Sequence, residues 1–344
     1  MKTDLFNYDL PPELIAQHPP ERRELARMMV LHRDSGQIEH RRIADLVEYL
    51  RAPDVLVLNN TKVIPARVFG HKAASGGKVE LLLLEEIRPG EWKVLMKTSR
   101  RPKAGDALSL CSGKARATML EDGELGEAVL KIESDRPLME ILDEEGVPPL
   151  PPYIARKEQT PEQVEKDKVR YQTVFAKNPG SAAAPTAGLH FTPELLEALA
   201  QQGVSKAELT LHVGLGTFRP VSADIITDHE MHYERYRVSE EAASTIAAAR
   251  ASGGRVVAVG STSVRTLESI PAIQAAEGST NIFIYPPYAF RNVDAILTNF
   301  HLPKSTLLMM MSAFAGRELM LQAYETAVAE KYRFFSYGDC MLIL

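Results

Sequence analysis

The most constraining feature of the sequence is a change of pattern between residues 66 and 147. Short segments of alternating polar and apolar residues recur there at roughly ten-residue spacing, separated by glycine-containing turns. The segments span residues 79–84, 91–96, 107–111, 115–119 and 127–132. Several short strands at this spacing predict a small antiparallel barrel or sandwich. The stretch ends at residues 148–152, where four prolines in five residues favour a stiff, extended connector.

On both sides of this stretch, strand patterns and helix patterns follow one another. Such alternation is typical of an α/β layer with a largely parallel sheet. Thr192, Pro193 and Gly203, for example, mark the two ends of one predicted helix. The predicted helices span residues 192–202, 240–250, 262–270 and 319–331, and the predicted strands span residues 209–213, 255–260, 282–285 and 295–298.

These patterns divide the chain into two units. We expect a larger α/β domain with a mostly parallel sheet, built from residues 1–65 and 148–344. We expect a smaller antiparallel β-barrel domain, residues 66–147, to be inserted between these two parts. The length of 344 residues fits two domains of about 150 residues each.

Charge and apolar content exclude some classes of protein. The net charge of -5, from 40 basic and 45 acidic residues, excludes a wholly basic surface, although a local basic cluster could still bind nucleic acid. No window reaches the roughly 18 uninterrupted apolar residues of a membrane helix. We expect no secretory signal. Cys111 and Cys340 are too few and too distant for a disulfide framework, so we expect a cytoplasmic protein without a membrane partner.

Histidines are concentrated in one part of the chain. Five of the nine lie between residues 190 and 301, namely His190, His212, His229, His232 and His301. A group that titrates near neutral pH suits proton transfer or metal binding. The HxxH spacing of residues 229–234 is not the HExxH of zinc enzymes, and no cysteine lies near. We therefore expect histidines in a polar cleft and no metal.

Two turns rich in small or hydroxyl residues are candidate anion sites. Residues 180–192 lead into a helix, whose first backbone N–H groups can bind an anion. Residues 260–268 place Ser263 and Arg265 at a helix start after a buried strand, which suits a carboxylate or a phosphate. Ordinary helix capping and tight packing remain the alternatives for both turns.

A third glycine turn does not support a dinucleotide site. Gly214 and Gly216 follow a strand, but the third glycine of the dinucleotide fingerprint is missing. Pro220 also excludes the helix that this fingerprint needs. We therefore exclude a nicotinamide or flavin cofactor.

Two further groups of polar residues are candidates for binding. Asn299 and His301 alternate with Phe300 and therefore face the same side of a predicted strand end. Tyr337 and Asp339 follow an aromatic stretch and could reach a cleft. A basic cluster in the β-rich region could contact phosphate or could be a solvated hairpin; it consists of Lys97, Arg100, Arg101 and Lys103.

Nine segments, in order along nearly the whole chain, together resemble the S-adenosylmethionine:tRNA ribosyltransferase-isomerase family of queuosine biosynthesis. Nine segments in the right order are far more specific than any one motif. They are VLNNTKVIPAR (57–67), PLPPYIAR (149–156), RYQTVFA (170–176), AAPTAGLHFT (183–192), LTLHVGLGTFRPV (209–221), HEMHYE (229–234), VAVGSTSVRTLES (257–269), TNFHLPKSTLL (298–308) and YRFFSYGDCMLI (332–343).

The resemblance implies a specific reaction. The family transfers and isomerises the ribosyl part of S-adenosylmethionine onto 7-aminomethyl-7-deazaguanine at the wobble position of a tRNA with a GUN anticodon. Epoxyqueuosine forms, and adenine and methionine leave. The resemblance also implies an α/β domain paired with a smaller β-barrel, a monomer, and no bound cofactor, since S-adenosylmethionine is a co-substrate.

This chemistry suggests roles for the candidate residues. The sulfonium acidifies the ribose C5′ hydrogens, so a base can remove one, and the departing adenine needs a proton. We expect the five histidines to frame one cleft, with His190 and His212 as the first candidates for the base or the acid. We expect substrate contacts from Thr186, Ser263, Arg265, Asn299, Tyr337 and Asp339, of which Ser263 and Arg265 suit the methionine carboxylate.

The acceptor RNA would lie between the two units, with its phosphates on the basic cluster of residues 97–103. Three alternatives stay open. The first is a metal-dependent hydrolase that uses His229, His232 and Glu234. The second is a non-catalytic tRNA-binding protein, which would release no adenine. The third is a methyltransferase, which would release S-adenosylhomocysteine.

Overall fold

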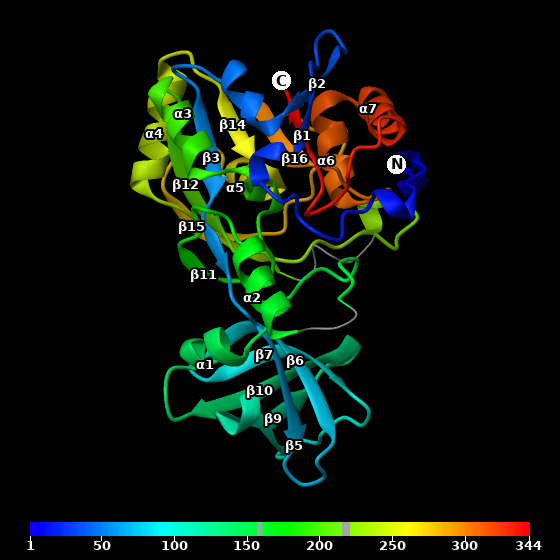
Figure 1. Ribbon diagram of the computed structural model, residues 1–344, viewed down its shortest axis with the longest axis vertical. Coiled ribbons are helices and arrows are strands. Elements are labelled where there is room, and N and C mark those ends of the chain that lie inside the picture. The colour runs from blue at the N-terminus through cyan, green and yellow to red at the C-terminus, as the bar shows by residue number, and fades with distance from the viewer. Residues whose placement is uncertain (157–159, 215–220) are drawn as a thin grey trace.

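The computed structural model describes residues 1–156, 160–214 and 221–344, and Figure 1 shows an upper unit of helices and strands above a smaller β unit. The upper unit is built on a nine-stranded sheet and the lower unit is a closed barrel. In the described part of the chain no helix has the length and apolar character needed to cross a bilayer.

The large sheet is mixed. Its strands, in spatial order, are β15 (Ala276–Thr280), β13 (Glu234–Val238), β12 (Ser205–Leu211), β3 (Val55–Asn59), β14 (Val256–Val259), β16 (Ala295–Asn299), β17 (Cys340–Ile343), β1 (Arg27–Leu31) and β2 (Ile38–Arg42). Strands β12, β3, β14 and β16 are parallel, as are β17 and β1, and the remaining neighbours are antiparallel.

The predicted α/β class with an inserted barrel is confirmed, but the expectation of a mostly parallel sheet has to be corrected to a mixed one. Parallel pairs need a crossover of a dozen or more residues, whereas only residues 32–37 separate β1 from β2. The predicted strand at residues 282–285 is also absent, and the edge of the sheet is formed by β15 instead. Pro286 and Pro287 follow that segment and cannot donate to a ladder.

Both faces of the sheet are covered because its central strands are apolar on both sides. In β14, Val256 and Ala258 pack into one hydrophobic cluster, and Val257 and Val259 pack into the other. The first cluster includes helices α4 (Glu240–Ala251), α5 (Gly260–Ser269), α6 (Thr306–Ala315) and α7 (Arg317–Ala329). The second includes helix α3 (Pro193–Gln201).

The barrel has its own core. Its strands are all antiparallel to their neighbours, in the order β10 (Glu127–Ser134), β7 (Glu91–Thr98), β6 (Lys78–Arg88), β5 (Arg67–Lys72), β8 (Ala107–Leu110) and β9 (Ala115–Asp122). Helix α1 (Leu138–Glu145) follows and contributes Ile141 and Leu142 to this core. The chain enters at Arg67 and leaves at Val147, and the backbones of these two residues exchange hydrogen bonds of 3.1 and 2.9 Å.

The direction of the parallel strands decides where a ligand can bind. Strand β3 runs toward the barrel and continues through β4 (Thr61–Val63), which pairs with β11 (Asn178–Ser181) (Figure 1). Strands β12, β14 and β16 run the same way, so their carboxyl ends also face the barrel. This edge is the usual ligand side of an α/β sheet. Helix α2 (Pro161–Arg170) lies between the two units.

At the amino ends of the parallel strands, a buried carboxylate joins two neighbouring strands. Asp54 accepts hydrogen bonds from the backbone N–H of Arg255 at 2.9 Å, from its guanidinium at 2.6 Å, and from the backbone N–H of Arg51 at 3.2 Å. It therefore joins the residues that directly precede β3 and β14. Burial alone would raise the pKa of Asp54, but these bonds outweigh burial and hold the pKa below the ordinary 3.8.

We expect the substitution Asp54→Asn to lower the free energy of unfolding by about 1.5–3 kcal/mol near neutral pH, because bonds to a charged group are lost. A lowered folded-state pKa stabilises the fold above the unfolded value, and this contribution disappears as the pH falls through the folded value. The difference between wild type and variant should therefore shrink below pH 3.8. Urea unfolding across this range measures it, and equal stabilities at neutral pH would contradict the assignment.

Candidate active site

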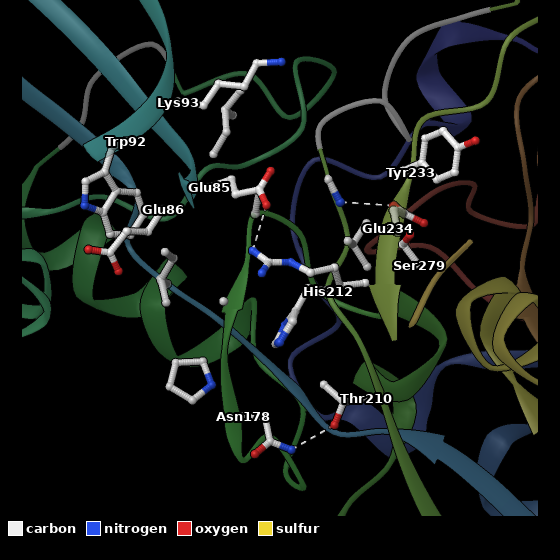
Figure 2. A pocket seen from close by; sticks show the side chains of 18 of the residues that line it. Glu85, Glu86, Trp92, Lys93, Asn178, Thr210, His212, Tyr233, Glu234 and Ser279 are labelled. Carbon is white, nitrogen blue, oxygen red and sulfur yellow. Dashed lines mark hydrogen bonds and ion pairs between the residues drawn. The ribbon is translucent and has the colours of Figure 1, made fainter. Parts of the chain in front are cut away.

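A large cavity lies between the carboxyl edge of the sheet and the near end of the barrel (Figure 2). Its volume is about 1120 Å³, which exceeds the roughly 300–1,000 Å³ of a pocket for one small ligand. Both units supply its walls. The sheet side includes Asn178, Gly180, Thr210, His212, His232, Glu234 and Arg235, and the barrel side includes Glu85, Glu86, Trp92, Lys93 and Leu95.

His212 is the predicted catalytic candidate that this cavity contains in a fixed position. Its Nδ1 atom lies 2.8 Å from the hydroxyl of Thr61, which is fully buried. When Nδ1–H donates to that hydroxyl, Nε2 keeps a free lone pair. Burial, together with the nearby charge of Arg235, lowers the pKa of His212 below 6.5. A neutral imidazole at physiological pH can act as a general base.

Gly180 explains how the ring of His212 is seated. The backbone of Gly180 has φ +141°, and a Cβ atom there would lie 3.0–3.3 Å from three ring atoms of His212. The close approach of backbone to imidazole therefore requires glycine at this position. The sequence already marked residues 180–192 as a turn of small residues, but the partner of that turn could not be predicted.

A side-chain clamp holds Thr61 opposite His212. The amide of Asn59 donates to the carbonyl of Leu211 at 2.9 Å, and its oxygen accepts the N–H groups of Leu211 and Thr61 at 3.0 and 3.1 Å. Asn59 thus replaces the backbone ladder where β3 and β12 separate. Both Thr61 and His212 follow this junction directly.

The buried ion pair of Glu234 and Arg265 lies where the large cavity meets a second, smaller one. Both side chains are buried, and the carboxylate of Glu234 also accepts the backbone N–H of Gly214 at 3.0 Å. Glu234 lines both cavities, and Arg265 lines the smaller one. The other walls of the smaller cavity are mainly apolar, among them Met231, Phe283, Leu307 and Met310.

The barrel side of the cavity was not predicted from the sequence. Glu85 of β6 forms an ion pair of 3.0 Å with Arg235 of β13, which crosses the cavity from one unit to the other (Figure 2). Trp92 and Lys93 of β7 lie in the same wall. Trp92 is the only tryptophan of the chain, which could have marked it as a candidate.

The five histidines do not share one cleft, and this expectation has to be corrected. His212 and His232 line the large cavity, whereas His229 lines only the smaller one, with its ring against Phe283. His190 lies in a separate small cleft beyond β4 and β11. His301 is buried at the end of β16, and its Nε2 lies 2.8 Å from the hydroxyl of Thr298.

The two most buried histidines are uncharged at neutral pH. Burial, with Arg23 and Arg333 nearby, lowers the pKa of His190 to about 4, and burial lowers the pKa of His301 to about 3. The amide of Asn299 lies 3.1 Å from Nε2 of His190. Both rings are therefore better explained as buried histidines with a structural hydrogen bond than as groups that exchange a proton with a substrate.

The geometry does not favour the metal alternative at His229, His232 and Glu234. Among the residues that the structure describes, no group of three or more His, Cys, Asp or Glu side chains could hold a metal ion. The carboxylate of Glu234 is bound by Arg265 instead.

The remaining predicted substrate contacts are spread over several places. Ser263 donates to the carbonyl of Val259 one helical turn back, at 2.9 Å, which occupies its hydroxyl. Asp339 accepts the backbone N–H groups of Arg27 and Arg333 and is a structural acceptor. Thr186 begins the short 3-10 helix that ends at His190. The glycine turn at residues 215–220 lies outside the described residues.

The predicted RNA-contacting cluster lies at the far end of the barrel. Val79 pairs with Thr98 and Arg88 pairs with Glu91, so residues 97–103 are at the opposite end of this hairpin from the cavity. Arg101 forms an ion pair with Asp122. Lys97, Arg100 and Lys103 are exposed. Their role in RNA binding stays a prediction.

Comparison with known proteins identifies the family. The model of the queuosine biosynthesis protein family matches residues 3–343. The chain belongs to this family. A Thermoanaerobacter sp. (strain X514) protein described as S-adenosylmethionine:tRNA ribosyltransferase-isomerase is 51% identical over 348 residues, covering 100% of both chains.

A solved structure agrees with this assignment. The crystal structure of the S-adenosylmethionine tRNA ribosyltransferase from Thermotoga maritima is 40% identical, with a TM-score of 0.56, and covers 99% of this chain and 100% of that one. The family inferred from the nine sequence segments is thus confirmed, and the protein is an enzyme of queuosine biosynthesis.

We expect His212→Ala to lower turnover by about 10²–10⁴-fold, the usual contribution of a general base. In the wild type, the base must be deprotonated, so kcat/KM should rise with pH. The midpoint of this rise should lie below pH 6.5, and kcat/KM should be constant above it. His71→Ala, at an exposed position of the barrel, is the matched control. Turnover within threefold of wild type in the His212 variant would remove His212 from the mechanism.

A second variant tests the position of the ring without removing it. Gly180→Ala places a methyl group against the imidazole of His212 and also strains the backbone at φ +141°. Displacement of a catalytic group by about 1 Å can cost about 10²-fold in rate. We therefore expect a loss of kcat in steady-state kinetics, and an unchanged kcat in a folded variant would show that the ring position is not critical.

Proposed function

We propose that this protein is an S-adenosylmethionine:tRNA ribosyltransferase-isomerase whose reaction takes place in the cavity between the sheet and the barrel. The observation that carries the proposal is the composition of that cavity. It is large enough for a nucleoside donor and an RNA base together, both units line it, and it holds a histidine whose pKa is lowered. These features support a reaction that joins two substrates.

His212 is our candidate for the base that removes a C5′ proton from the ribose. The adjacent sulfonium stabilises the resulting carbanion, and opening of the sugar then expels adenine. The neutral aminomethyl nitrogen of the acceptor base forms a C–N bond to the opened sugar and loses a proton. An oxygen of the sugar then closes the epoxide and displaces methionine from its carbon, so methionine leaves as the second product. Thr61 orients the imidazole: when its hydroxyl accepts a hydrogen bond from Nδ1–H, the lone pair of Nε2 is left to remove the proton. His232, exposed in the same cavity, is available for proton transfer to the leaving groups.

The methionine part of the donor fits the ion pair of Glu234 and Arg265. A methionine end carries a carboxylate and an ammonium group, and Arg265 and Glu234 offer the complementary charges. The apolar walls of the neighbouring small cavity suit the carbon chain and sulfur of the donor. Among the described residues, the Nε–H of Arg265 is buried without a hydrogen-bond partner, so a donor remains for the ligand.

The acceptor would enter from the barrel side. Lys93 forms an ion pair of 2.9 Å with Glu127 and can turn from it to a phosphate. Trp92 belongs to the barrel core and is 8% exposed, so only a small part of its ring is available for the stacking that RNA bases outside a helix require. The proposal includes tRNA with a GUN anticodon that carries 7-aminomethyl-7-deazaguanine, a monomer that acts in the cytoplasm, and no cofactor besides the co-substrate.

The deciding experiment is an assay of products. The protein is incubated with S-adenosylmethionine and tRNA that carries the aminomethyl precursor, and the small molecules are separated by mass. We expect free adenine and methionine in equal amounts, with a matching mass gain of the RNA. S-adenosylhomocysteine as the product would indicate methyl transfer, and tRNA binding without any adenine would indicate a binding protein; either result would overturn the proposal.

The donor site is tested with Arg265→Lys, which keeps the charge but loses the planar fork. We expect kcat/KM for S-adenosylmethionine to fall by about 10–100-fold, since one or two bonds to a charged group are lost, while the affinity for tRNA is unchanged. Arg317→Lys, at a half-buried helix start that lines neither cavity, is the control. An unchanged KM and kcat would place the methionine end elsewhere.

A further inference from the structure

A second polar site lies outside the large cavity, in the small cleft that contains His190. Arg23, Arg170, His190 and Tyr337 line this cleft. Arg23 belongs to a short 3-10 helix, Arg170 ends helix α2, and Tyr337 follows the aromatic stretch near the C-terminus. The mechanism proposed above uses none of these side chains.

Within the described part of the chain, the two arginines of this cleft donate to backbone carbonyls alone. Arg23 donates to the carbonyls of Leu189 and Gln172 at 3.0 and 2.8 Å. Arg170 donates to the carbonyls of Glu21 and Pro20 at 3.0 and 2.5 Å. In the ranges that the structure describes, neither guanidinium forms an ion pair. Each therefore keeps a positive charge that no carboxylate neutralises.

Two donors in the same place lack acceptors. The hydroxyl of Tyr337 and the Nε–H of Arg170 are buried and have no hydrogen-bond partner among the described residues. Tyr337 is 2% exposed. Leaving such groups without a partner destabilises a fold unless a ligand or water supplies one.

Asp167, whose charge acts on Tyr337, is already bound by other side chains. Asp167 binds the guanidinium of Arg156 through both oxygens, at 2.8 and 2.9 Å, and accepts a third bond from Gln163 at 3.1 Å. His190 adds no charge, because its pKa is lowered to about 4. The cleft therefore offers positive charge and hydrogen-bond donors, and its natural ligand is an oxyanion.

The cleft lies close to the large cavity. The carbonyl of Gln172 accepts a bond from Arg23, and the side chain of Gln172 exchanges two hydrogen bonds, of 3.0 and 3.1 Å, with the backbone of Val63. Val63 belongs to β4, which pairs with β11, and Gly180 of β11 lines the large cavity. The two sites are thus separated by this pair of short strands.

We infer that Arg23, Arg170 and Tyr337 bind a phosphate of the acceptor RNA, close to the nucleotide that enters the large cavity. This inference rests on the proposed function, which supplies the RNA. A phosphodiester fits better than the carboxylate of an amino acid, because no Asp or Glu among the described residues lines the cleft to bind the accompanying ammonium group. The bound phosphate accepts from the Tyr337 hydroxyl and from the guanidinium groups.

Two variants test this site. Tyr337→Phe removes a hydroxyl that has no partner among residues 1–156, 160–214 and 221–344, so the melting temperature of the variant should not fall. Its tRNA affinity should weaken about tenfold, as for one lost bond to a charged group. Arg170→Gln should weaken tRNA binding and reduce the slope of log Kd against log salt concentration by about one. Tyr49→Phe and Arg317→Gln, which lie away from both cavities, are the matched controls.

The outcomes distinguish this inference from the proposed function. Binding is measured with the precursor tRNA, and KM for S-adenosylmethionine is measured alongside. Unchanged tRNA affinity and salt slope in both folded variants would overturn the phosphate site, even if wild type releases adenine. A raised KM for S-adenosylmethionine with unchanged tRNA affinity would assign the cleft to the donor carboxylate and would also overturn it. Absence of adenine release by wild type, with the predicted loss of tRNA affinity, would overturn the proposed function alone.

Discussion

The amide side chain of Asn59 determines the geometry of the site. At this residue the chain leaves the sheet and crosses toward the barrel, so β3 and β12 separate and their ends lose ladder partners. Asn59 supplies three of the missing hydrogen bonds from a position that is 1% exposed. A buried backbone end without such partners would be costly. The clamp therefore permits the crossing and fixes Thr61 and His212 opposite each other.

The same crossing produces the cavity. Because β4 continues into the barrel and pairs with β11, the barrel end is held beside the carboxyl ends of the parallel strands. The cavity thus has one wall from each unit, and the ion pair of Glu85 and Arg235 spans it. Arg235 also helps to keep His212 neutral. The volume of the cavity and the neutral state of the His212 imidazole therefore both depend on how the two units are joined.

The sequence predicted those features that depend on neighbouring residues. The side chain of Thr192 caps helix α3 as expected, and the alternating segments form the antiparallel barrel. Local signals could not show which histidines meet, because His190 and His212 are separated by the strand pair β4 and β11, whose partners are more than 100 residues apart. For the same reason the sequence did not indicate that Arg265 pairs with Glu234, nor that Lys97 lies far from the cavity.

The central claim is that the reaction begins with removal of a C5′ proton from the donor in the cavity between the two units. A single-turnover measurement with S-adenosylmethionine deuterated at both C5′ positions tests it most directly. The account predicts that wild-type protein, saturated with precursor tRNA, releases adenine more slowly from the deuterated donor than from the unlabelled one. Equal rates of adenine release at the pH of maximal activity would contradict it.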